Sequence, residues 1–144
     1  MATTEELVKV LGGRGVLKHR VRNIQELERL VQEGLPYRAL EKVMERFGLE
    51  LSETQRVLLM PLRTLSRRKA MARMKAVESD RLIRLARIGA HAVQVFGTDE
   101  KAATWLHRPI RALDNRAPLD LLRTDLGTKQ VENVLGRIEH GVIG

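Results

Sequence analysis

The sequence of 144 residues contains no cysteine and few aromatic residues. Without cysteine, the chain cannot form disulfides, thiolate metal sites or cysteine nucleophiles. Aromatic residues make up only 3% of the chain, which argues against a platform on which the bases of single-stranded nucleic acid stack. No apolar run approaches the roughly 18 residues that a membrane span needs. Glu5 and Glu6 stand where a signal peptide would be basic and then apolar. We therefore expect a cytoplasmic protein with no membrane partner.

The sequence also lacks the residue patterns that enzymes use. None of its three serines lies in a Gly-x-Ser-x-Gly motif. No Lys-Ser or Lys-Thr pair follows the glycines of residues 12–15, as a phosphate-binding loop requires. The four histidines show neither His-x₃-His nor His-Glu-x-x-His spacing; they are His19, His91, His107 and His140. We expect a protein that is not an enzyme and that binds no metal or cofactor.

Positive charge is in excess and is unevenly distributed. The formal net charge is +8. Residues 1–77 hold 16 basic and 9 acidic residues, a net charge of +7, whereas residues 78–144 hold 10 and 9, a net charge of +1. Positions 54–77 contain no acidic residue at all. We expect a boundary near residue 77, with different partners for the two halves.

The spacing of apolar residues is helical along almost the whole chain. Helices are predicted between Asn23 and Gly34, from Pro36 to Gly48, and over a long run that ends at Gly97. Thr98 is expected to cap the next helix. Further short helices are predicted at residues 119–126 and 131–138, and Gly127-Thr128 is expected to start the second of them. Residues 15–21 fit a short β ribbon. The predicted fold class is all-α.

Residues 52–69 form a helix, a break and a second helix. Ser52 and Gln55 are the expected capping box of the first helix, and Pro61 separates it from residues 62–69. This is the layout of a helix-turn-helix, whose second helix enters the major groove of DNA. We expect Leu62 and Leu65 to pack inward. The expected DNA-binding residues are Arg56, Arg63, Thr64, Ser66, Arg67, Arg68 and Lys69, with Arg68 and Lys69 nearer the phosphate backbone. The alternatives are a solvated basic face or one that binds a protein.

The C-terminal residues 137–144 begin on a helix and leave it at Gly141. From the residues alone we favour a frayed end, which is the usual state of such a tail. The alternative is a tail that becomes ordered in the cleft of a partner, with Val142 and Ile143 as apolar anchors.

Four motifs in this order resemble those of the Xre/MbcA/ParS antitoxins. Gly34-Leu35-Pro36 with Ala39-Leu40 is similar to a helix start of that family. The segments 63–68 and 78–87 are similar to its RTLxRR and ESDRLxRLAR patterns. The fourth motif is similar to the family's toxin-binding domain and comprises Trp105, Leu106, Pro109, Leu113, Pro118, Leu119, Leu121, Leu122, Thr124, Gly127, Val131, Leu135 and residues 137–141. The resemblance covers residues 24–144, whereas residues 1–23 match poorly.

The resemblance implies a type II antitoxin that binds and neutralises a RES-type toxin, an enzyme that depletes NAD. It implies a helix-turn-helix of the Xre/Cro type in residues 1–77, packed on a small helical toxin-binding domain in residues 78–144. It also implies a homodimer, and a complex that binds operator DNA and represses its own promoter. The C-terminal region of the family is thought to block the active site of the toxin. In this sequence that region corresponds to Arg137, Glu139, His140, Gly141, Val142 and Ile143, in place of a merely frayed end.

A second function is compatible with the same residues. It is a stand-alone repressor whose C-terminal half only dimerises, and a toxin gene directly downstream would argue against it. Under either function we expect the same apolar residues in the core or an interface. They are Leu40, Val43, Phe47, Leu58, Leu65, Leu82, Leu85, Val93, Phe96, Trp105, Leu106, Leu122, Val131 and Leu135.

Overall fold

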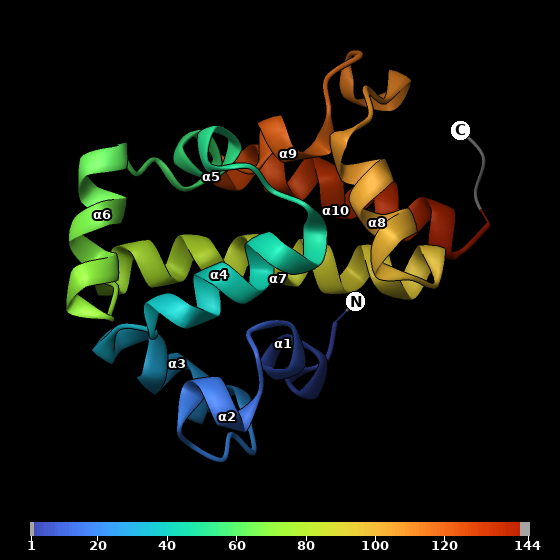
Figure 1. Ribbon diagram of the computed structural model, residues 1–144. Coiled ribbons are helices and arrows are strands. Elements are labelled where there is room, and N and C mark those ends of the chain that lie inside the picture. The colour runs from blue at the N-terminus through green and yellow to red at the C-terminus, as the bar shows by residue number, and fades with distance from the viewer. Residues whose placement is uncertain (1, 142–144) are drawn as a thin grey trace.

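The computed structural model describes residues 2–141 and, over that range, contains helices and no β-strand (Figure 1). The all-α prediction is therefore confirmed. The helices are α1 (Thr4–Val10), α2 (Arg14–Leu17), α3 (Ile24–Glu33), α4 (Tyr37–Phe47), α5 (Leu51–Leu58), α6 (Leu62–Met71), α7 (Ala76–Phe96), α8 (Asp99–His107), the 3₁₀ helix η1 (Arg111–Leu113), α9 (Pro118–Leu121) and α10 (Asp125–Glu139).

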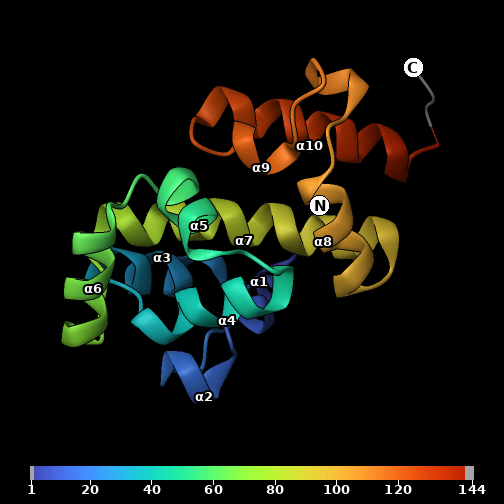
Figure 2. The same ribbon diagram turned by 45° about the horizontal axis from the view of Figure 1, so that its top comes forward.

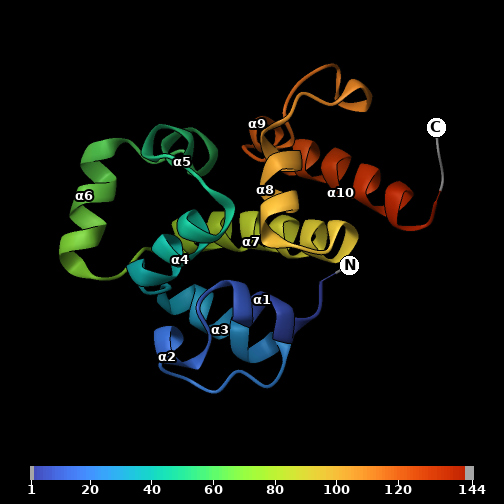
Figure 3. The same ribbon diagram turned by 45° about the vertical axis from the view of Figure 1, so that its right-hand side comes forward.

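Helix α7 is the axis of the molecule. It packs against α1, α3, α4 and α5 and also against α8 and α10. Figure 3 shows α1 and α3 on one side of α7, with α9 and α10 on the other. Figure 2 shows α9 and α10 as a layer above α7, and α6 at the edge of the molecule farthest from the C-terminus. Because it is covered on both sides, α7 buries residues around most of its circumference.

The core contains most of the residues that the apolar spacing predicts. Of that predicted set, all are buried except Val93 and Phe96, which are half-buried. The ring of Phe96 packs against that of Trp105, with centroids 5.4 Å apart. Gly89 allows close packing in this core, because an added methyl carbon would lie 2.5 Å from Cε2 of Phe47. Helices α4 and α7 can therefore pack this closely only because residue 89 has no side chain.

Several predicted helix ends are confirmed. The side chain of Asn23 accepts a hydrogen bond from the backbone N–H of Glu26 at 2.9 Å, and that of Thr98 accepts one from Lys101 at 3.1 Å. These caps satisfy N–H groups that have no partner within the helix. Gly48 and Gly97 end α4 and α7 with positive φ angles of 63° and 94°.

Three local predictions are wrong. Residues 14–17 form the short helix α2 rather than a β ribbon. The capping box of α5 begins at Glu50, whose N–H donates to the Glu53 carboxylate at 2.8 Å, and not at Ser52. Helix α10 begins after Thr124 and runs through Gly127, where the sequence suggested a restart. An added methyl carbon at Gly127 would overlap the carbonyl of Leu121, so this glycine serves packing and not a turn.

No helix over residues 2–141 has both the length and the apolar character needed to cross a membrane.

Candidate functional site

Helices α5 and α6 are joined by a tight turn at Leu59–Pro61. Leu59 ends α5 in the left-handed conformation, and Pro61 precedes the first residue of α6. Met60 is buried at this turn, as is Leu65 one turn into α6. Leu62, however, is 49% exposed, so the prediction that it packs inward is wrong. As the first residue of α6, Leu62 lies at the rim of the core, and Met60 is the buried side chain instead.

The outer face of α6 carries most of the expected DNA-binding residues. Arg63, Ser66, Arg67 and Lys69 are exposed, and Thr64 is half-buried. Within residues 2–141, the three cations of this face make no ion pair, so their charge is available to an anionic partner. We call Arg63, Thr64, Ser66, Arg67 and Lys69 the α6 face.

Arg68 corrects the sequence prediction. Its side chain points into the protein, is 5% exposed, and donates from Nε to Oε1 of Glu78 at 2.7 Å. A guanidinium in that position cannot reach a phosphate, and it fixes α6 on the first turn of α7 instead. The signal was present in the sequence. Arg68 follows the buried Leu65 by three residues, and residues three apart share one face of a helix.

The first turn of α7 completes this attachment. The Glu78 carboxylate also accepts from the backbone N–H of Lys75 at 2.9 Å. Burial alone would raise the pKa of Glu78, but the hydrogen bonds and charges of Arg68 and Lys75 outweigh burial and lower this pKa. The buried Ser79 hydroxyl accepts from the N–H of Leu35 at 2.8 Å. The first turn of α7 is therefore anchored to the loop between α3 and α4.

Arg56 is exposed on α5, but it already has a partner. Its guanidinium lies 3.1 Å from the carboxylate of Asp120 on α9. Two further side-chain contacts cross in the same way between the N-terminal and C-terminal helices. They are the Arg46–Asp99 ion pair at 2.9 Å and the contact between Nε2 of His107 and the Glu53 carboxylate at 3.0 Å. Arg56 thus joins the two parts of the molecule.

The last turn of α10 is the second candidate site. Arg137, His140 and Gly141 are exposed there, and the φ angle of Gly141 is +70°, so the chain turns out of the helix at this point. Val142 and Ile143, which the sequence suggested as apolar anchors, lie outside the described residues. Glu139 faces α7, where Nε2 of His91 lies 3.2 Å from its carboxylate. The hydrogen bond from His91 is the main reason why the pKa of Glu139 is lowered.

A cleft of about 600 Å³ adjoins this last turn. Arg87 and His91 line it from α7, and Glu132, Gly136 and Glu139 line it from α10. Arg87 pairs with Glu132 at 2.7 Å, so this ion pair and the His91–Glu139 hydrogen bond tie the two helices together along the cleft. Neither Arg87 nor His91, the two partners on α7, was among the site residues predicted from the sequence. Their signal is helical spacing, because Arg87 and His91 lie four residues apart and Glu132 and Glu139 lie seven apart, so each pair shares one helix face.

Two family models match consecutive parts of the chain. Residues 26–87 match the antitoxin Xre-like helix-turn-helix domain, and residues 91–141 match the antitoxin Xre/MbcA/ParS C-terminal toxin-binding domain. The two matches meet within α7. The division that the charge distribution suggested, at residue 77, lies in the first turn of the same helix.

Three relatives that are named antitoxin Xre are similar to this chain. One from Photorhabdus laumondii is 36% identical over 119 residues, which cover 81% of this chain and 80% of the relative. One from Pseudomonas putida is 38% identical over 117 residues, which cover 81% and 72%. One from Yersinia enterocolitica is 41% identical over 93 residues, which cover 63% of both chains.

Proposed function

This chain belongs to the Xre antitoxin family, and we propose from that premise that it neutralises a RES-type toxin and represses its own operon. A helix-turn-helix joined to a toxin-binding domain is the layout of a type II antitoxin. The proposal concerns what this layout leaves open, which is the kind of toxin, the way it is inhibited and the use of the DNA-binding half.

Inhibition of the toxin is assigned to the last turn of α10 and the residues after it. The observation that carries this assignment is that Arg137, His140 and Gly141 are exposed at the end of a helix that is itself held on α7. In this proposal residues 137–143 enter the active-site cleft of the NAD-degrading toxin. Arg137 would bind a carboxylate, and Val142 and Ile143 would fill apolar space. Occlusion of a cleft needs no catalytic group on the antitoxin.

Binding to operator DNA is assigned to the α6 face. The guanidinium groups of Arg63 and Arg67 match the O6 and N7 acceptors of guanine, whereas Lys69 and the hydroxyls of Thr64 and Ser66 suit phosphates. Arg68 supports this face from behind through Glu78. We further propose that two copies bind an operator with two half-sites, because a helix-turn-helix reads about one half-site per copy.

The first test is co-expression with the reading frame beside the gene of this chain. We expect growth rescue, a stable complex on a tag, and an end to NAD loss in cells that make the toxin. Truncation after Glu139 should abolish rescue and leave the circular dichroism spectrum and DNA binding intact. A truncated chain that still rescues growth would contradict inhibition by the C-terminal segment. Survival without this chain, or no complex, would favour the stand-alone repressor.

The DNA-binding half has a matched test. Arg63→Ala/Arg67→Ala removes two charges from the α6 face, and Arg20→Ala/Arg29→Ala removes two exposed charges from outside it. We expect only the first variant to lose operator affinity strongly and to discriminate less between the operator and unrelated DNA, because its two guanidinium groups are assigned to base edges. It should still neutralise the toxin. Equal losses in both variants would contradict the assignment to α6.

A further inference from the structure

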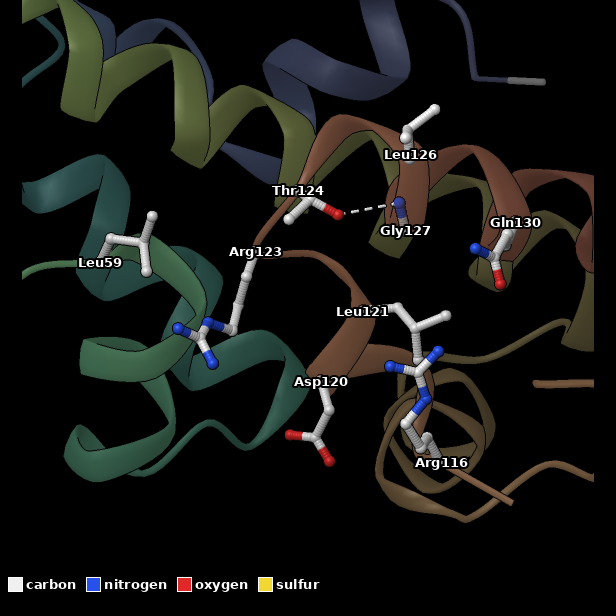
Figure 4. A pocket seen from close by; sticks show the side chains of 9 residues that line it. All are labelled: Leu59, Arg116, Asp120, Leu121, Arg123, Thr124, Leu126, Gly127 and Gln130. Atoms are coloured by element: carbon white, nitrogen blue, oxygen red, sulfur yellow. Dashed lines mark hydrogen bonds between the residues drawn. The ribbon is translucent and has the colours of Figure 1, made fainter. Parts of the chain in front are cut away.

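A second pocket, of about 340 Å³, lies at the opposite end of α10 from the C-terminal turn (Figure 4). Leu59, from the turn after α5, forms one wall. The rest of the lining comes from α9, its flanking segments and the start of α10, and comprises Arg116, Asp120, Leu121, Arg123, Thr124, Leu126, Gly127 and Gln130. We call this pocket the α9–α10 groove. It brings the helix-turn-helix and the C-terminal domain together in one surface.

The charge of the groove is positive. Arg116 and Arg123 are exposed and make no ion pair within residues 2–141, and Figure 4 shows their side chains on either side of Asp120. The one carboxylate of the lining, on Asp120, is paired with Arg56. The groove therefore offers two guanidinium groups to an acidic ligand, and its own negative charge is already offset.

Apolar side chains lie between these charges. Leu126 is 77% exposed and Leu59 is 43% exposed, while Leu121 is buried beneath them. The base of the groove is closely packed, because the Thr124 hydroxyl accepts from the N–H of Gly127 at 2.9 Å and Gly127 leaves no room for a side chain beside the Leu121 carbonyl. Exposed leucines on such a base favour a ligand that buries them.

We propose that the α9–α10 groove binds a segment of the toxin that presents a carboxylate next to an aliphatic side chain. This inference rests on the proposed function and adds a second toxin contact, separate from the C-terminal segment. Charge complementarity selects the carboxylate, and Leu59 and Leu126 select the aliphatic neighbour. All of the lining except Leu59 lies within the residues that match a toxin-binding domain. DNA is a poorer ligand, since the exposed leucines offer nothing to phosphates.

The position of the groove gives this contact a distinct role. Helix α10 has 15 residues, so about 22 Å separates its two ends. A toxin that holds the C-terminal segment in its active site reaches the groove with another part of its surface. The interface between antitoxin and toxin then includes both the C-terminal segment and the groove. Such an interface has the standard size of a protein complex, which an inserted tail alone would not reach.

The test uses charge reversal at two pairs of arginines. Arg116→Glu/Arg123→Glu reverses the charge of the groove, and Arg108→Glu/Arg111→Glu makes the same change at exposed residues of the same domain outside it. We expect the groove variant to bind the purified toxin at least tenfold more weakly at low salt, with a smaller loss at high salt. The matched control should stay within about twofold of the wild type. Leu126→Ser, at an exposed position, should weaken the complex by up to about tenfold, because it removes apolar burial.

The outcomes separate the two proposals. If the wild-type chain forms no complex with the toxin, the proposed function falls and the groove contact falls with it. If the wild type binds and the groove variant binds equally well, the groove contact alone is overturned. Equal losses in the groove variant and the control would also overturn it, because they would show a general charge effect. A loss of operator affinity confined to the groove variant, with the toxin complex intact, would assign the groove to DNA instead.

Discussion

The first turn and the middle of α7 are attached to neighbouring helices by ion pairs of the same length and different burial. At the N-terminal end, Arg68 and Glu78 lie 2.7 Å apart, and their side chains are 6% and 10% exposed. At the middle of the helix, Arg87 and Glu132 also lie 2.7 Å apart, but their side chains are 38% and 25% exposed. Distance alone does not distinguish these contacts, whereas burial does.

The difference follows from what water can do when one partner is lost. A buried charge without its partner cannot be solvated, so the pair that holds α6 must stay intact. A partly exposed charge is readily solvated, so the Arg87–Glu132 pair between α7 and α10 can open at little cost. The Arg68–Glu78 pair thus contributes strongly to the position of the helix proposed to bind DNA. The Arg87–Glu132 pair adds little to the position of α10, which is held on α7 by buried apolar residues such as Val131 and Leu135.

The largest effect is expected from Arg68→Ala. It leaves the Glu78 carboxylate buried without its partner, which should lower the free energy of unfolding by about 3–5 kcal/mol. Urea denaturation measures this loss. The matched control is Arg67→Ala, next to it and exposed, which should change stability by less than about 0.5 kcal/mol. Similar losses at the two positions would contradict the burial argument.

A smaller loss, with a pH dependence, is expected from Glu78→Gln. At pH 7 the variant loses a charged hydrogen bond, which should cost about 1.5–3 kcal/mol. Because the pKa of Glu78 is lower in the folded than in the unfolded state, its contribution is complete above the ordinary carboxyl pKa of about 4.3 and is lost as pH falls through the folded pKa. The difference in stability between the wild type and the variant should therefore narrow in acid. A constant difference between pH 7 and acid would refute this account.

Two glycines extend the comparison to backbone packing. Gly89→Ala places a methyl group against the Phe47 ring and should cost about 1–3 kcal/mol. Gly136→Ala, on α10, meets no atom within 4 Å and should instead stabilise the helix by up to about 1 kcal/mol. Thermal unfolding of the two variants should move in opposite directions. A loss at both positions would show that the end of α10 is packed more tightly than the structure indicates.

The smallest effect is expected for the Arg87–Glu132 pair. A double-mutant cycle with Arg87→Ala and Glu132→Ala should give a coupling free energy of about 0.2–1 kcal/mol, because both side chains are partly solvated. Salt should reduce this value further. A coupling of several kcal/mol would show that this pair is as strong as Arg68–Glu78 and would remove the difference between the two ion pairs of α7.

Much of the fold and part of the candidate site could be predicted from the sequence. The caps at Asn23 and Thr98 and the turn at Pro61 depend on neighbouring residues, and all three lie where local patterns place them. The elements that were predicted wrongly depend on contacts with residues outside the local sequence pattern. Gly127 is the clearest case, since a glycine usually ends a helix and this one lies within α10 because the Leu121 carbonyl approaches it.

Spacing along the chain was enough to predict an all-α protein, a helix-turn-helix with a basic second helix, and a C-terminal segment that leaves its helix at Gly141. The reason is that these properties depend on which residues are three or four positions apart. The tertiary structure was needed to show that Arg68 points inward to Glu78, that Arg56 is paired with Asp120, and that Leu59 meets Arg123 in one groove. Each of these arrangements depends on how helices pack against one another, and the period of a helix gives a side chain its face but not the neighbour it meets there.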